Sequence, residues 1–180
     1  MSHSARNLRR YVVTSACTVV LLCAACVTRH DGVITTVILV RHAEKADAGD
    51  DPPLTEGGKD RALALAHVLG EVDVDAVYST PYARTRETAW PLAQLQGLPV
   101  TEVPADDYGE RMATLIRSQH VGDIVVAVSH SNTVPVLIQE LGAGPAPVIE
   151  EDEYDDLYVV TIDALGKAML LNLRYGRESP

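Results

Sequence analysis

VILVRHAEKADAGD, residues 37–50, joins an apolar run to a polar loop through an arginine and a histidine. The run begins at residue 33 as VITTVILV and has the aliphatic, β-branched composition of a buried strand. Arg41 and His42 follow directly, and the acidic, glycine-bearing segment after them is typical of a loop. The strand therefore delivers two polar side chains to the point where it leaves the core.

The rest of the chain alternates strand patterns with helix patterns. Thr55 is expected to cap a first helix, and Thr80, with Pro81 in the first turn, a second one that Gly97 ends. This alternation predicts a single α/β domain, a three-layer αβα sandwich with a mostly parallel central sheet. The last two strands are joined by a short turn and should form an antiparallel edge. Strands are predicted at 33–40, 74–79, 98–104, 123–129, 157–163 and 167–175, and helices at 54–70, 80–97, 108–119 and 131–142.

The first 25 residues have the composition of a secretory leader. Three arginines precede an apolar stretch of about fifteen residues that ends in small side chains. Ala24-Ala25-Cys26 resembles a lipoprotein cleavage site, so we predict a signal peptide over 1–25, a tether over 26–32 and the domain over 33–176. A lipid on Cys26 would anchor the domain at the periplasmic or another extracytoplasmic face, its only attachment to the membrane. An uncleaved signal anchor and plain secretion are the alternatives.

Charge and cysteine content limit the partners and the means of stabilisation. The net charge is −10, and it becomes −13 once the leader with its three arginines is removed. Such a chain is repelled by nucleic acid and by anionic membrane surfaces, so neither is expected as a partner. All three cysteines lie in the leader or at its end, so the predicted domain has no disulfide.

Chemistry-bearing side chains follow three of the predicted strands. Arg41 and His42 end the first strand, Arg84 lies shortly after the second, and His130 ends the fourth. Since the carboxyl ends of parallel strands meet at one edge of a sheet, we expect these groups on one rim. Arginine presents a planar fork of donors that fits a phosphate, and histidine can act as a nucleophile near neutral pH. The pattern favours phosphoryl transfer through a phosphohistidine.

Simpler interpretations exist for each of these residues. Arg41 and His42 could cap the strand and pair with Asp47 or Asp50. Arg84 could pair with a neighbour on its own helix face, and His130 could be a buried structural histidine. His67 and His120 share no strand end and are interpreted as surface or structural residues.

Four segments of the chain resemble the histidine phosphatase superfamily, in its phosphoglycerate-mutase-like branch. They are LVRHAEK, LTEGGKDRA, VYSTPYARTRETA and VSHSNTVP, and the resemblance runs from about residue 33 to 175. It implies that His42 is the nucleophile that becomes phosphorylated. Arg41, Arg84 and His130 would cage the phosphoryl group, with Ser131 and Asn132 as further substrate-binding residues. No metal or organic cofactor is implied.

The general acid and a second acidic segment stay open. The family resemblance implies an acid after the third strand, where VPADDYGERM offers Asp106, Asp107 and Glu110. We choose Asp106, with Asp107 next and Glu44 as another possibility. The run IEEDEYDDLYVV, residues 149–160, is usual for a solvated loop. It could instead face the rim, where it would repel anionic substrates or hold a basic part of one, or it could bind a cation.

These features predict an exported, metal-independent phosphoric monoester hydrolase. Its substrate would be a phosphorylated small molecule or a phosphoprotein, including phosphohistidine. One alternative is a non-catalytic phosphate- or phosphopeptide-binding lipoprotein. Another is a metal-dependent hydrolase with His42, Glu44 and His130 as ligands, which the neighbouring arginines oppose. The sequence does not indicate the oligomeric state.

Overall fold

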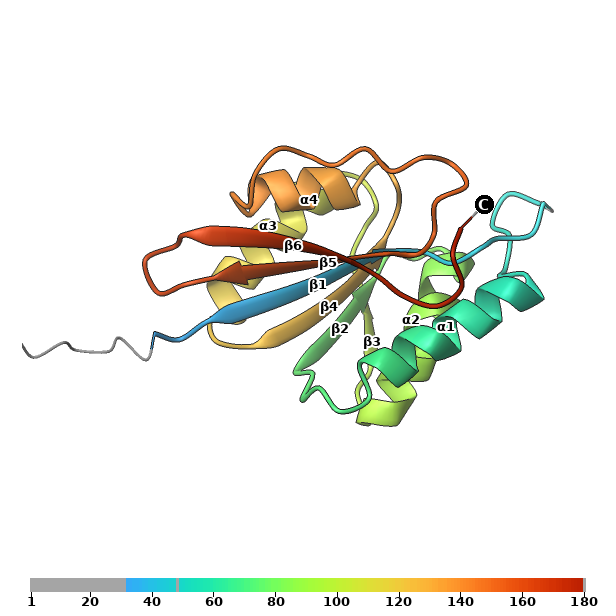
Figure 1. Ribbon diagram of the computed structural model, residues 1–180, viewed down its shortest axis with the longest axis horizontal. Coiled ribbons are helices and arrows are strands. Elements are labelled where there is room, and N and C mark those ends of the chain that lie inside the picture. Colours follow the sequence, from blue (N-terminus) through green and yellow to red (C-terminus); the bar gives the residue numbers. More distant parts are fainter. Residues whose placement is uncertain (1–31, 48, 180) are drawn as a thin grey trace, which may run out of the picture. The chain divides into compact units, whose positions relative to one another are not determined.

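The computed structural model describes residues 32–47 and 49–179, so the predicted signal peptide and Cys26 lie outside the described residues. No helix within these ranges is long and apolar enough to cross a membrane. Strands and helices alternate along most of the described chain (Figure 1). The elements are β1 Thr35–Arg41, α1 Glu56–Val68, β2 Ala76–Ser79, α2 Ala83–Gln96, β3 Val100–Glu102, α3 Tyr108–Gln119, β4 Ile124–Ser129, α4 Val134–Glu140, β5 Asp156–Ile162 and β6 Ala168–Arg174.

The six strands form one sheet in the order β3-β2-β4-β1-β5-β6. The first four of these run parallel to one another, whereas β5 is antiparallel to β1 and β6 is antiparallel to β5. The predicted mostly parallel sheet with an antiparallel edge is confirmed. Because β1 lies beside β4 in register, Arg41 is opposite Ser129, and the two strands end at the same rim.

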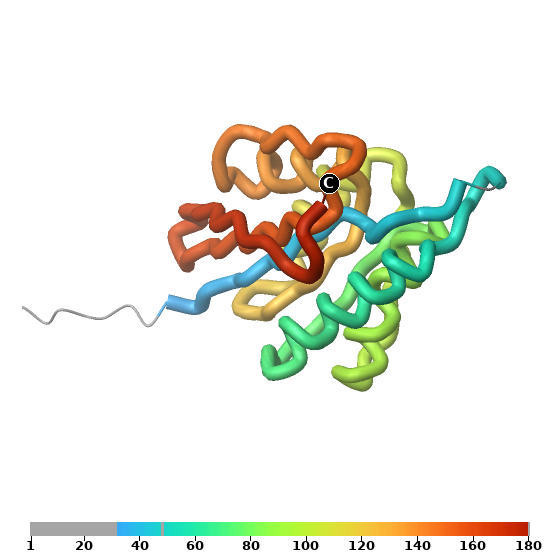
Figure 2. Tube along the Cα trace, turned by 45° about the vertical axis from the view of Figure 1, so that its right-hand side comes forward, coloured from blue at the N-terminus to red at the C-terminus, as the bar shows by residue number. Residues whose placement is uncertain are grey.

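The sheet is covered by helices on both faces, as Figures 1 and 2 show. Val37 and Leu39 of β1 are fully buried in the core beneath α3 and α4, and Ile38 and Val40 belong to the core beneath α1 and α2. Successive residues of a strand point to opposite faces, so a continuous apolar run fills both cores. The three-layer prediction is therefore confirmed, and β1 lies in the interior of the sheet between β4 and β5. The strand predicted over 33–40 begins later than expected, because Val33 and Ile34 precede β1 and are exposed.

The two helix starts predicted from threonines differ in outcome. Thr55 caps α1, since its side chain accepts a hydrogen bond from the Gly58 amide at 3.0 Å. The expectation for Thr80 is wrong, because α2 begins only at Ala83. Asp51, from the loop after β1, accepts a hydrogen bond from the Ala83 amide with both carboxylate oxygens, at 2.9 and 3.1 Å. An acid from a distant part of the chain thus replaces the predicted local cap. The hydroxyl of Thr80 instead contacts His130 at the carboxyl ends of the strands. Gly97 ends α2 in the left-handed conformation, as expected.

Candidate active site

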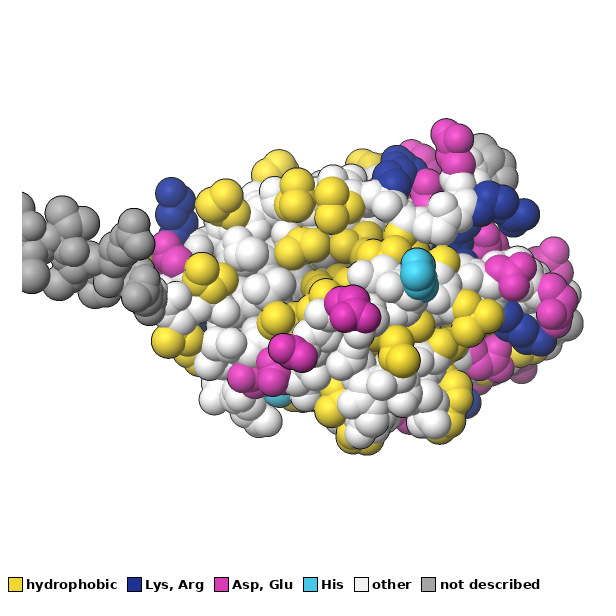
Figure 3. Space-filling view, turned by 60° about the horizontal axis from the view of Figure 1, so that its bottom comes forward, with side chains coloured by type: hydrophobic (Ala, Val, Ile, Leu, Met, Phe, Trp, Pro, Cys, Tyr) yellow, Lys and Arg dark blue, Asp and Glu magenta, His cyan; other side chains and the backbone are white. Residues whose placement is uncertain are grey.

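The parallel strands β1, β2 and β4 end at one rim of the sheet (Figure 1). A solvent-accessible pocket of about 380 Å³ opens there. Charged side chains of both signs gather at this end of the molecule (Figure 3). The pocket contains the four predicted catalytic residues Arg41, His42, Arg84 and His130, the preferred acid Asp106, and Ser131 and Asn132. Its lining consists of Arg41, His42, Lys45, Tyr82, Arg84, Ala105, Asp106, His130, Ser131, Asn132, Thr133 and Glu151.

His42 is held with one ring nitrogen available to the pocket. The side chain is 4% exposed, and its main-chain amide donates to the Ser129 carbonyl at 2.8 Å, which ties it to β4. Nδ1 lies 2.8 Å from the carbonyl of Ala43. A carbonyl can only accept, so Nδ1 carries the proton and Nε2 keeps its lone pair in the neutral ring.

Burial is the main reason that the pKa of His42 falls to about 3, and the positive charges of Arg41 and Arg84 act in the same direction. His130 lies beside it, with the ring centroids 5.4 Å apart in an edge-to-face arrangement. Burial and the same two arginines lower the pKa of His130 to about 4. Its Nε2 is 3.0 Å from the hydroxyl of Thr80, the residue released from helix capping. Both imidazoles are therefore neutral at pH 7 before an anion enters.

Arg41 is fixed by main-chain carbonyls and an aromatic ring. Its Nη1 donates to the carbonyls of Glu150 at 2.7 Å and Glu153 at 3.0 Å. The guanidinium carbon lies 4.2 Å from the centre of the Tyr154 ring. This arrangement differs from the simpler interpretation, in which the arginine pairs with a carboxylate of the loop after β1. It positions the guanidinium without neutralising its charge.

Arg84 reaches the pocket from the first turn of α2. Its guanidinium carbon is 4.3 Å from the centre of the Tyr82 ring, and its Nη1 is 3.7 Å from the Asp51 carboxylate. The Nε atoms of Arg84 and Arg41 are both buried without a hydrogen-bond partner. Buried donors of this kind normally have a partner, so the pocket is prepared for a ligand that accepts hydrogen bonds. Arg86 is different, because it is exposed and pairs with Glu102 outside the pocket.

Of the candidate acids, only Asp106 lines the pocket. Asp107 precedes α3 in the left-handed conformation and lines a separate hollow together with Glu110. Glu44 accepts hydrogen bonds from Arg61 at 2.8 to 3.1 Å. Burial raises the pKa of Glu44, but these hydrogen bonds outweigh it and hold the pKa below its ordinary value.

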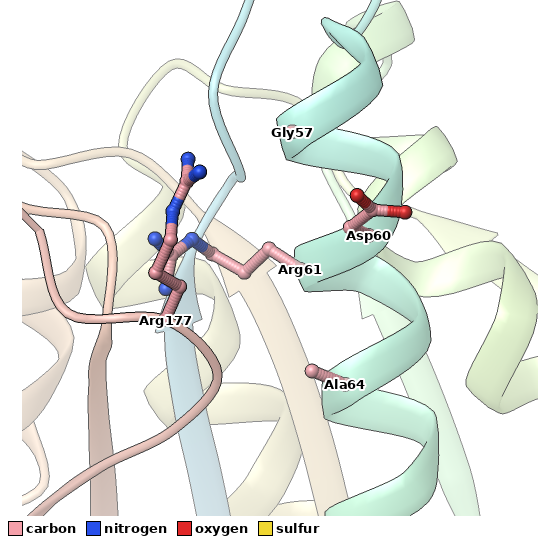
Figure 4. A pocket seen from close by; sticks show the side chains of 5 residues that line it. All are labelled: Gly57, Asp60, Arg61, Ala64 and Arg177. Carbon is pink, nitrogen blue, oxygen red and sulfur yellow. The ribbon is translucent and has the colours of Figure 1, made fainter.

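The pairing of Glu44 also bears on metal binding. Arg61 extends from α1 toward β1, with Arg177 beside it (Figure 4). Because Glu44 is engaged by Arg61, it does not join His42 and His130 in a common ligand set. Within residues 32–47 and 49–179, no three His, Cys, Asp or Glu side chains are grouped to hold a metal ion.

The contribution of the acidic run is the feature that sequence reasoning left undecided. β5 is antiparallel to β1, so its amino end and the loop before it lie at the carboxyl end of β1. The loop consequently supplies Tyr154 and two carbonyls to Arg41, and Glu151 to the pocket. The solvated-loop interpretation is wrong for Asp155 and Asp156, which are 2% and 3% exposed. The tyrosine within this acidic run was the one feature of the sequence that could have indicated a contact with the pocket.

The fold and the pocket together define a class of protein: an α/β domain in which a neutral histidine lies beside two arginines at the carboxyl ends of the strands. Residues 37–105 match the family model of the histidine phosphatase superfamily (branch 1). Phosphoserine phosphatase 1 of Hydrogenobacter thermophilus is 39% identical over 71 residues, which cover 36% of this chain and 34% of the relative. The chain thus spans about a third of the length of that curated relative.

Solved structures share the fold over most of the chain. The protein histidine phosphatase SixA, complexed with tungstate, has a TM-score of 0.63 and 23% identity, covering 77% of this chain and 96% of that one. A mycobacterial glucosyl-3-phosphoglycerate phosphatase with inorganic phosphate has a TM-score of 0.61 and 17% identity, covering 80% and 98%. A phosphoglycerate mutase from Bacillus anthracis has a TM-score of 0.62 and 14% identity, covering 79% and 94%. The chain is thus similar to the histidine phosphatase superfamily (branch 1) over residues 37–105, and it shares the fold of these solved structures over most of its length.

Proposed function

We propose that the protein is a phosphatase that hydrolyses phosphomonoesters through a phosphohistidine intermediate on His42. The observation that carries this proposal is the pocket itself. A neutral histidine with an available Nε2 lies beside two arginines whose Nε donors are buried and unpartnered. A phosphoryl group supplies both an electrophile for the nitrogen and oxygens for the donors.

The proposed reaction has two steps. Nε2 of His42 attacks phosphorus, an N–P bond forms, and the P–O bond to the leaving group breaks. Water then cleaves the N–P bond and releases inorganic phosphate. Arg41, Arg84 and His130 would hold the phosphoryl oxygens. The positive charge of the two arginines and the hydrogen bonds of all three side chains would stabilise the negative charge of the transition state. The bond from Nδ1 to Ala43 keeps the histidine in the reactive tautomer throughout.

Asp106 is proposed as the general acid that protonates the leaving oxygen. Its position at the pocket supports this role, since Asp107 and Glu110 line another hollow. Glu44 is a weaker choice because Arg61 stabilises its ionised form, and an ionised carboxylate has no proton to give.

The substrate is proposed to be a phosphorylated small molecule or a phosphoprotein. The pocket is open to solvent, which leaves room for leaving groups of different sizes. The similar proteins are named as a phosphoserine phosphatase, a protein histidine phosphatase and a glucosyl-3-phosphoglycerate phosphatase. These names suggest the phosphomonoester or phosphoramidate class rather than one member of it.

Export as a lipoprotein, with Cys26 carrying the lipid, remains a proposal that rests on the leader sequence. Mass spectrometry of the chain purified from membranes tests it. Loss of residues 1–25 and a diacylglyceryl-type mass on the new terminus are expected, whereas an intact amino terminus would contradict the proposal.

The experiment for the function measures phosphate release from p-nitrophenyl phosphate and a panel of phosphomonoesters, with EDTA present. The wild-type chain should turn over, and His42→Ala should lose activity by at least about three orders of magnitude while keeping its melting temperature. His67→Ala, which changes an exposed histidine on α1, is the matched control and should retain full activity. Phosphate binding without turnover by the wild type would favour a binding protein. Activity that EDTA abolishes would favour the metal-dependent alternative.

A further inference from the structure

The loop before β5 is held rigidly from both sides. We call residues 150–156, EEDEYDD, the acidic segment. Arg174 of β6 pairs with Glu153 at 2.8 Å and with Asp155 at 2.7 Å. Asp156 accepts a hydrogen bond from the Tyr158 hydroxyl at 3.0 Å. On the other side the segment binds Arg41 through two carbonyls, as described above. Its main chain is thereby fixed against the pocket.

This anchoring leaves one carboxylate of the segment for the pocket. Glu150 and Asp152 border a neighbouring hollow with Arg174, together with Glu153. Glu151 alone among the acids of the segment lines the candidate active site. It is exposed, and the rigid main chain on either side limits where its side chain can go. A negative charge on an anchored stretch of main chain therefore lies at the edge of the candidate active site.

The charges of the pocket differ between its floor and its mouth. Arg41 is 5% exposed and, with the partly buried Arg84, provides the positive floor. The exposed charged groups of the pocket lining are Lys45, Asp106 and Glu151. Lys45 is the single cation among them. The carboxylates of the acidic segment and the net charge of −10 reinforce the negative sign there. A leaving group that projects from the floor must pass through this negative mouth.

We propose that Glu151 determines specificity, favouring phosphomonoesters whose leaving group carries a cationic nitrogen close to the phosphate and disfavouring those with a second anionic group. This inference rests on the proposed phosphatase function. The phosphate is attracted by the arginines in every substrate, so Glu151 discriminates only through the leaving group. Ammonium, guanidinium and imidazolium groups would all pair with its carboxylate at the mouth.

The test uses the full-length chain and three probes: p-nitrophenyl phosphate, phosphoethanolamine and phosphoglycolate. The last two are nearly equal in size and differ in whether an ammonium or a carboxylate lies beside the phosphate. Phosphoethanolamine and phosphoglycolate are each measured as a competitive inhibitor of p-nitrophenyl phosphate hydrolysis. The wild type should bind phosphoethanolamine at least about tenfold more tightly than phosphoglycolate. Glu151→Gln should reduce this ratio by about threefold to tenfold, an effect that shrinks in high salt.

Two further variants distinguish a direct contact of the Glu151 carboxylate with the leaving group from the combined electrostatic effect of the surrounding charges. Asp152→Asn removes the same charge one residue away, beside the neighbouring hollow, and should change the ratio by less than about twofold. Lys45→Gln removes the cation at the mouth and should increase the ratio. An unchanged ratio in Glu151→Gln, or an equal change in Asp152→Asn, would overturn the specificity assignment alone. Failure of the wild type to hydrolyse p-nitrophenyl phosphate and every member of the functional panel would overturn the proposed function, and this inference with it.

Discussion

Arg84 combines a positive charge, an aromatic contact and several hydrogen-bond donors in one side chain. Its planar guanidinium stacks on Tyr82, the side chain lines the pocket, and its Nε is buried without a hydrogen-bond partner. A lysine at this position would keep the charge but would lose the stacking and the fork that binds two oxygens at once. The residue is therefore more than a source of positive charge.

We expect Arg84→Lys to lower kcat/KM roughly 30- to 1000-fold, which corresponds to a loss of about 2–4 kcal/mol of transition-state stabilisation. Steady-state kinetics with p-nitrophenyl phosphate measures it. Arg86→Lys is the matched control, because Arg86 is exposed on the same helix and pairs with Glu102. Equal kinetics for the two variants would show that Arg84 does not bind the phosphoryl group.

The two pocket histidines predict how stability depends on pH. In the unfolded chain a histidine binds a proton near pH 6.5, whereas the native pKa values are about 3 for His42 and about 4 for His130. Between these values the unfolded state binds more protons, so the free energy of unfolding falls as the pH falls from 6.5 toward 4. Each histidine contributes about 1 kcal/mol per pH unit in this window.

Urea unfolding at pH 7 and pH 5 tests this prediction. His42→Gln should lose less stability than the wild type over the interval, because one of the two contributions is absent. His67→Gln, which changes an exposed histidine on α1, should behave like the wild type. Parallel losses in all three proteins would contradict a strongly lowered pKa for His42.

At the scale of elements, helix α1 packs directly on the loop that follows His42. A Cβ atom added to Gly58 would lie 2.3 Å from the carbonyl oxygen of Glu44. The glycine near the start of α1 is therefore required by a close approach between helix and loop, despite its low helix propensity. A Cβ atom on the adjacent Gly57 would meet the flexible end of Arg177 at 3.3 Å instead.

We expect Gly58→Ala to destabilise the fold by about 1–3 kcal/mol and to reduce activity, since the helix must move away from the loop that positions His42. Gly57→Ala should be neutral or stabilising by up to about 1 kcal/mol, because alanine is the better helix former. Thermal unfolding and kcat on both variants provide the comparison. A larger loss of stability in Gly57→Ala would contradict the packing argument.

The antiparallel end of the sheet is the second element-scale determinant of the pocket. If β5 ran parallel to β1, the acidic segment would lie at the opposite rim, and Arg41 would lose its two carbonyl partners. The reversed direction of β5 brings Glu150, Glu153 and Tyr154 to the strand end that carries Arg41. The edge of the sheet thus contributes to the site as well as to the core.

On the scale of the whole molecule, stability comes from two apolar cores without covalent cross-links. The cores on the two faces of the sheet consist mainly of Val, Leu, Ile and Ala. No cysteine occurs after residue 26. A reducing agent should therefore leave the melting temperature of the full-length chain unchanged, measured by circular dichroism with and without dithiothreitol. A decrease of several degrees would indicate a disulfide that contributes to the fold.

Much of this molecule follows from the sequence alone. The apolar run 33–40, the alternation of strand and helix patterns and the short final turn determine a mostly parallel three-layer sheet, because period and composition are local properties. The placement of Arg41, His42, Arg84 and His130 on one rim follows as well, because parallel strands end together. Their catalytic roles remain proposals.

Contacts between distant segments could not be predicted from the sequence and are seen only in the folded protein. Asp51 replaces Thr80 as the cap of α2, Arg61 engages Glu44, and the acidic segment supports Arg41. Each is a contact between residues that lie far apart in sequence, so no local propensity or spacing encodes it. The choice among the candidate acids also depends on the tertiary structure, because Asp106 lines the pocket whereas Asp107 and Glu110 line another hollow. The sequence determines which groups are available, and the packing of loops onto the sheet determines which of them meet.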